Sequence, residues 1–163
     1  AEAALQALAA DHAEYTRAAV ALSGLRAAQE HKAAGNAAYV GSRFEEAVGC
    51  YSAALEADAE GMLTPVLLGN RAQAHLQNAH YEEALQDIAV ALRMDATSPK
   101  LLLRRGQARA SLGQVGEARA DFDAVLGLQP SNAAAIDGLA KLERAQARRD
   151  ADRSGGGGGG GGG

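Results

Sequence analysis

Three stretches of this chain repeat one pattern of small and large apolar residues. They are FEEAVGCYSAAL (44–55), YEEALQDIAVAL (81–92) and VGEARADFDAVL (115–126). Ala84 and Ala118 are 34 residues apart, whereas Ala47 and Ala84 are 37 apart, which indicates a three-residue insertion near 62–64. Each stretch follows another segment in which apolar residues recur at helical spacing. The pattern therefore predicts a pair of helices, repeated three times.

The composition suits closely packed helices. Hydrophobic residues make up 47% of the chain, but only 4% are aromatic and there is no Trp. A β-sandwich would favour β-branched and aromatic side chains instead. The formal net charge of −4 disfavours nucleic-acid binding. No cationic amphipathic stretch indicates a membrane surface, and no apolar run approaches the ~18 residues of a membrane span.

Two further features of the sequence concern its cellular compartment and its relation to a longer protein. Cys50 is the only cysteine, so the chain forms no internal disulfide or cysteine-type zinc site, and we expect a reducing, cytoplasmic compartment. The first residue is Ala1 rather than Met, and we expect the chain to be a piece of a longer protein.

Start and stop signals support the helical reading. Thr-Pro at 64–65 and Ser-Pro at 98–99 each place a capping hydroxyl before a proline at the first helical position. The residues SRFE at 42–45 have the pattern of a capping box. Ser131 or Asn132 is expected to cap the last helix.

This helix–turn–helix period of 34 residues resembles the tetratricopeptide repeat (TPR). The resemblance depends on small residues that face the partner helix and on an aromatic residue that fills the space they leave. The matching residues are Gly35, Ala47, Tyr51 and Ala54 in the first repeat, Ala72, Ala84 and Ala91 in the second, and Gly106, Ala118, Phe122 and Pro130 in the third. Ile88 replaces the aromatic of the second repeat, and Val125 replaces a small residue of the third.

The resemblance implies an all-α fold, an α-solenoid with three tandem TPR helix hairpins at 28–61, 65–98 and 99–131. We expect residues 1–26 to be a helical segment, the end of an upstream repeat. We expect 132–150 to be a capping helix with the polar outer face that a terminal repeat needs. Residues 154–163 end in nine glycines and are expected to be a disordered tail.

The first helix of each pair lines the inner groove of such a stack. The positions expected to face the groove hold amides, lysines and an arginine, with no acid among them, in a chain that is acidic as a whole. Lys100 and Arg104 are four residues apart on one helix face, where like charges repel by roughly 0.2–0.5 kcal/mol. Cations held together in this way predict an anion site.

Five of these residues closely resemble the dicarboxylate clamp of TPR co-chaperones, in which KxxxN, N and KxxxR fall in three consecutive repeats. They are Lys32, Asn36, Asn70, Lys100 and Arg104. The resemblance implies that the chain binds the C-terminal Glu-Glu-Val-Asp tail of heat-shock protein 70 or heat-shock protein 90. It implies that Lys32, Asn36, Asn70 and Lys100 hold the carboxylates of the last residue, and that Arg104 meets an upstream acidic side chain or backbone carbonyl.

Other assignments complete the prediction. Tyr39 and Leu103 are candidates for the apolar wall beside the valine of the peptide. A TPR scaffold that binds another partner without recognising a terminal carboxylate remains an alternative. The arrangement of the segments looks most like the J-domain co-chaperones, although no His-Pro-Asp motif is present. No catalytic set, phosphate loop or metal motif is present, so no enzymatic activity, cofactor or metal is expected, and the histidines are read as surface residues.

Overall fold

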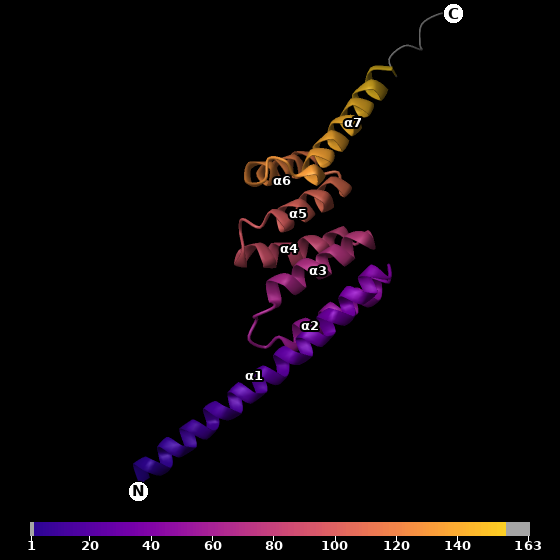
Figure 1. Cartoon of the computed structure of the whole chain (residues 1–163). Helices are drawn as coiled ribbons and strands as arrows, with labels where there is room; N and C mark the ends of the chain where they lie inside the picture. Colours follow the sequence, from indigo (N-terminus) through magenta and orange to yellow (C-terminus); the bar gives the residue numbers. More distant parts are fainter. Residues whose placement is uncertain (1, 156–163) are drawn as a thin grey trace, which may run out of the picture. The chain divides into compact units, whose positions relative to one another are not determined.

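The computed structural model describes residues 2–155, and every regular element in that range is a helix (Figure 1). The all-α prediction is confirmed. The helices are α1 (Glu2–Val40), α2 (Phe44–Ala57), α3 (Thr64–Gln77), α4 (Tyr81–Met94), α5 (Pro99–Ser111), α6 (Val115–Leu128) and α7 (Ala133–Gly155). None of the helices in the described part of the chain is both long and apolar enough to cross a membrane.

The helices form two compact units, the first ending at Ala96 and the second beginning at Thr97. In the first unit α1 packs against α2, α2 against α3, and α3 against α4. In the second unit α5 packs against α6, and α7 contacts both of these helices. The first unit therefore holds two helix hairpins, and the second unit holds one hairpin with an additional helix.

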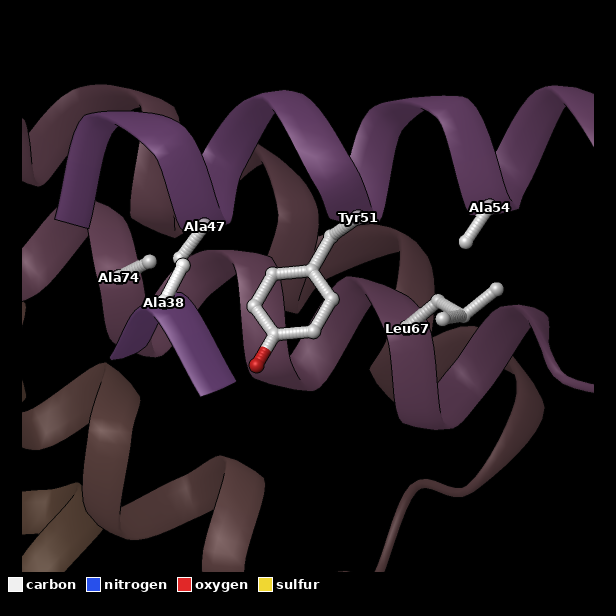
Figure 2. Close-up of a cluster of buried hydrophobic side chains, with 6 residues drawn as sticks. All are labelled: Ala38, Ala47, Tyr51, Ala54, Leu67 and Ala74. Atoms are coloured by element: carbon white, nitrogen blue, oxygen red, sulfur yellow. The ribbon is translucent and has the colours of Figure 1, made fainter. Parts of the chain in front are cut away.

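One cluster in the core of the first unit consists mainly of small residues around an aromatic ring (Figure 2). The buried cluster consists of Ala38, Ala47, Tyr51, Ala54, Leu67 and Ala74. In the second unit Phe122 has the corresponding role, because its ring lies against the backbone of Gly106 and Gly138. The interpretation that small residues let the helices approach while an aromatic fills the remaining space is confirmed in both units.

All three hairpins close through the same turn. Ser42, Ala79 and Gly113 have φ values of 57°, 58° and 75°, in the left-handed region. The amide of the following residue then donates to a carbonyl five residues back, as Arg43 does to Ala38 at 2.9 Å. This closure satisfies the carbonyls at the end of the first helix.

The capping box expected at 42–45 is wrong. Ser42 is the left-handed residue of the turn, and Arg43, which makes no side-chain capping hydrogen bond, precedes α2. Thr64 lies inside α3 and donates its hydroxyl to Asp58, which also accepts the Leu63 amide. Asn132 does accept the Ala135 amide at 3.1 Å, as predicted for the last helix.

The helix ends also differ from the expected segment boundaries. Helix α1 is continuous from Glu2 to Val40 and has no end between 26 and 28, because strong helix formers fill that stretch and no proline interrupts the helix. Helix α7 continues to Gly155 rather than ending at 150. Of the expected tail at 154–163, the first two residues belong to α7, and residues 156–163 lie outside the described part of the chain.

Candidate functional site

Two amide side chains and one tyrosine hydroxyl, here called the amide cluster, join three helices of the first unit. Asn36 is exposed on α1, one turn after the half-buried Lys32 on the same face. The Tyr51 hydroxyl on α2 donates to Oδ1 of Asn36 at 2.8 Å. Nδ2 of Asn70, on α3, makes a longer contact of 3.5 Å with the same oxygen. The structure therefore brings together Asn36 and Asn70, which are 34 residues apart in the chain.

Lys32 has no acidic partner among the described residues, so the charge beside the amide cluster is not neutralised by the protein. Tyr39, the predicted apolar residue of the first unit, is half-buried and packs against the core cluster. Its ring meets the ring of Phe44 edge-on, with centroids 5.4 Å apart. This leaves an aromatic surface one turn beyond Asn36 on α1.

Helix α5 of the second unit places Lys100, Leu103 and Arg104 within its first two turns. Lys100 is exposed, Leu103 is half-buried, and Arg104 is only 8% exposed. The positive charge of Arg104 lowers the pKa of Lys100, and desolvation lowers it further. The ammonium of Lys100 is thus held in a position that a nearby anion would stabilise.

Arg71, Arg105 and Arg109 form ion pairs with buried aspartates, an arrangement that the sequence analysis missed. Arg71 donates to both carboxylate oxygens of Asp87 at 2.8 and 2.7 Å. Arg105 likewise donates to both oxygens of Asp121, from Nε to Oδ2 at 3.0 Å and from Nη2 to Oδ1 at 2.6 Å, and Arg109 adds a third donor. The visible signal was an arginine followed 16 residues later by an aspartate in two successive repeats.

The first hairpin lacks this ion pair. The repeat places Ala34 and Cys50 where the second hairpin has Arg71 and Asp87. Cys50 is a half-buried free thiol. The paired arginines hold the two helices of a hairpin together, so they have a structural role that distinguishes them from the unpaired Lys32.

One histidine departs from the expected surface position. His75 is half-buried on α3, and desolvation is the largest of the effects that lower its pKa. Its Nδ1 is buried without a hydrogen-bond partner among the described residues. Across residues 2–155, no group of three or more His, Cys, Asp or Glu side chains is arranged to hold a metal ion.

The repeated hairpins and the buried small residues define a class of helical repeat protein. The model of the tetratricopeptide repeat family matches residues 32–99 and 70–133. The chain belongs to the tetratricopeptide repeat family.

The chain is also similar in sequence to individual proteins. The chain is 38% identical to human RNA polymerase II-associated protein 3 over 119 residues, which cover 73% of this chain and 17% of that protein. The chain thus spans less than a fifth of the length of this relative.

Two similar solved structures contain bound peptides. One is the first TPR of Spaghetti (RPAP3) bound to the HSP90 peptide SRMEEVD, with a TM-score of 0.68, 32% identity, and coverage of 76% of this chain and 95% of that one. The other is the second TPR domain of human RPAP3 in complex with the HSP70 peptide SGPTIEEVD, with a TM-score of 0.64, 34% identity, and coverage of 74% and 95%.

Proposed function

We propose that this chain is a protein-interaction module of a co-chaperone and binds the C-terminal Glu-Glu-Val-Asp tail of heat-shock protein 70 or heat-shock protein 90. The observation that carries the proposal is that two TPR domains of similar sequence and fold hold peptides with this ending. The module itself has no enzymatic role in this proposal. Its lone free cysteine is consistent with a cytoplasmic setting.

Lys32, Asn36 and Asn70 are the residues of the first unit that we assign to the terminal aspartate, together with Lys100. A carboxylate only accepts hydrogen bonds, whereas asparagine amides and lysine ammoniums supply donors. Donors that carry a charge form the stronger hydrogen bonds. The contact between Asn36 and Asn70 and the absence of an acidic partner for Lys32 support this assignment.

The remaining assignments concern the upstream part of the peptide. Arg104 meets an acidic side chain or a backbone carbonyl, and Tyr39 and Leu103 form apolar surface for the valine. The half-buried state of these two apolar side chains supports the last assignment, because each keeps some surface available for contact. Lys32, Asn36, Tyr39 and Asn70 belong to the first unit, and Lys100, Leu103 and Arg104 belong to the second.

A calorimetric titration tests the proposal with the peptides SRMEEVD and SGPTIEEVD, each as a free acid and with an amidated C-terminus. We expect the free acids to bind with a Kd on the order of micromolar, about −8 kcal/mol, and the amidated forms not to bind. Higher salt should weaken binding. Equal binding of free and amidated peptides would overturn the proposal.

Two matched lysine variants test the site assignment. Lys100→Ala should abolish binding without loss of helicity. Lys141→Ala removes the same charge from an exposed pair with Asp137 on α7 and should leave binding unchanged. If both variants bind as the wild type does, the site assignment is wrong. If the wild type itself does not bind these peptides, a TPR scaffold that binds another partner becomes the favoured alternative.

The finer assignment to a J-domain co-chaperone is also part of this proposal. It is supported only by the order of the segments, with helical residues before the three hairpins and a basic helix after them. Sequencing the rest of the coding region tests it directly. A flanking domain with a His-Pro-Asp motif is the expected result, and a full-length chain without one would contradict it.

A further inference from the structure

Tyr51 connects the core of the first unit to the proposed peptide site. The side chain is only 2% exposed, and its ring belongs to the buried cluster of small residues. Figure 2 shows its hydroxyl oxygen on the side of the ring away from Ala47 and Ala54. This oxygen donates the 2.8 Å hydrogen bond to Oδ1 of Asn36. The buried Tyr51 is therefore hydrogen-bonded to the side-chain amide of the exposed Asn36.

The contact determines which end of the Asn36 amide is available. An asparagine side chain has one acceptor oxygen and an NH₂ group with two donors. The oxygen faces the Tyr51 hydroxyl and the Nδ2 of Asn70, so the NH₂ group points to the other side. A carboxylate can be bound only by that NH₂ group. The opposite orientation of the amide would place its NH₂ group against the NH₂ group of Asn70, and would turn Oδ1 toward the carboxylate, which has no hydrogen to donate.

We propose that Tyr51 is a positioning residue for carboxylate recognition, because its hydroxyl holds the Asn36 amide with the NH₂ group toward the peptide. The inference rests on the proposed function and adds a residue to it that does not touch the peptide. Without the hydroxyl, the ring edge offers no donor to Oδ1, and only the longer contact of 3.5 Å from Nδ2 of Asn70 still orients the amide. Part of the binding energy then goes into reordering it.

The third hairpin indicates that the hydroxyl is not needed for packing. Phe122 occupies the corresponding place there, and its ring lies against Gly106 as the ring of Tyr51 lies against Gly35. In both hairpins a Cβ on the glycine would be 2.7 Å from the Cε1 atom of the ring. A phenylalanine therefore fits this kind of site, and Tyr51→Phe removes the hydroxyl while keeping the ring.

The test compares Tyr51→Phe with Tyr15→Phe, which removes a hydroxyl from a side chain that is 75% exposed on α1. Titration uses the free-acid peptide SRMEEVD. We expect Tyr51→Phe to bind about tenfold more weakly, as loss of one ordering hydrogen bond implies. Tyr15→Phe should bind as the wild type does. An affinity of Tyr51→Phe within about twofold of the wild type would overturn the inference.

A double-mutant cycle with Asn36→Ala separates positioning from a general effect on structure. If Tyr51 acts through Asn36, then adding Tyr51→Phe to Asn36→Ala should cause no further loss of affinity. The same loss in both backgrounds would mean that the hydroxyl supports the site in some other way. The side-chain amide signals of Asn36 in the NMR spectrum of the free protein provide a second readout. They should shift in Tyr51→Phe, and unchanged signals would contradict the proposal.

The outcomes distinguish this inference from the proposed function. If the wild type requires a free C-terminus and Tyr51→Phe binds equally well, only the role of Tyr51 is wrong. If the wild type binds free and amidated peptides alike, carboxylate recognition itself is wrong, and the positioning role is rejected with it.

Discussion

Gly35 lies so close to the ring of Tyr51 that a Cβ at position 35 would be 2.7 Å from Cε1 and 2.8 Å from Cδ1. The Gly35→Ala variant must therefore displace a buried ring. Overpacking costs about 1–3 kcal/mol, while the better helix propensity of alanine returns about 1 kcal/mol. We expect a net loss of stability of up to about 2 kcal/mol in urea denaturation.

Gly49 provides the control for that prediction. It lies in the middle of α2, and a Cβ added there would meet no atom within 4 Å. Gly49→Ala should therefore stabilise the protein by about 1 kcal/mol through helix propensity alone. A loss of stability in both variants would show that close packing is not the reason for glycine at position 35.

The left-handed turns predict a pair of variants with opposite effects. Ala79 has a φ of 58°, which is unfavourable for a residue with a Cβ. Ala79→Gly should stabilise the protein by about 1 kcal/mol in thermal denaturation. Gly113→Ala should destabilise it by a similar amount, because φ at this position is 75°. An added Cβ would meet no atom within 4 Å, so the backbone conformation alone causes the loss. Effects of the same sign would contradict the role assigned to these turns.

Removal of a buried carboxylate should strongly destabilise the second unit. The Asp121 side chain is 3% exposed and pairs with Arg105 and Arg109. Asp121→Ala leaves both cations without this partner, at a cost of about 3 kcal/mol. Asp137→Ala breaks only exposed pairs on α7 and should cost less than about 1 kcal/mol. Chemical denaturation of the two variants checks the difference, and equal losses would refute it.

The repulsion between Lys100 and Arg104 predicts a gain in stability when the lysine loses its charge. Lys100→Gln should raise the free energy of unfolding by about 0.2–0.5 kcal/mol, because two like charges four residues apart no longer repel. Lys141→Gln removes an attractive pair with Asp137 and should lower it by a similar amount. Denaturation at low salt tests this, and a loss of stability in Lys100→Gln would be the contrary result.

The half-buried His75 predicts a pH-dependent stability. Desolvation lowers its pKa most; Asp87 and Glu83 oppose the effect, while Arg71 and His80 add to it. The unfolded chain therefore takes up a proton more readily than the folded protein does. The contribution of neutral His75 is complete above the unfolded pKa of about 6.5 and is lost as the pH falls through the lowered folded value.

Melting temperatures at pH 7.5 and pH 5 measure this effect. The wild type should lose more stability between the two pH values than His75→Gln does. The control is His12→Gln, which changes an exposed histidine on α1 and should leave the wild-type difference intact. If His75→Gln shows the full wild-type pH dependence, another group is responsible.

The sequence alone determined the helices and their pairing. Apolar residues at helical spacing and a 34-residue period are local and repetitive signals, so they predicted three hairpins before any contact was known. The small residues and the aromatics were also recognisable as packing positions, and the structure pairs Tyr51 with Gly35 and Phe122 with Gly106. Lys100 and Arg104 were recognisable as a repelling pair from their spacing alone.

Only the tertiary structure decided where polar side chains direct their hydrogen bonds. The serine at 42 has the residue type of a cap, but closure of the turn places it in a left-handed conformation that a local motif does not reveal. The ion pair of Arg71 with Asp87 and the bond from Tyr51 to Asn36 join different helices. Such bonds depend on helix packing in three dimensions, and helical periodicity specifies which face a residue occupies but not which partner it meets.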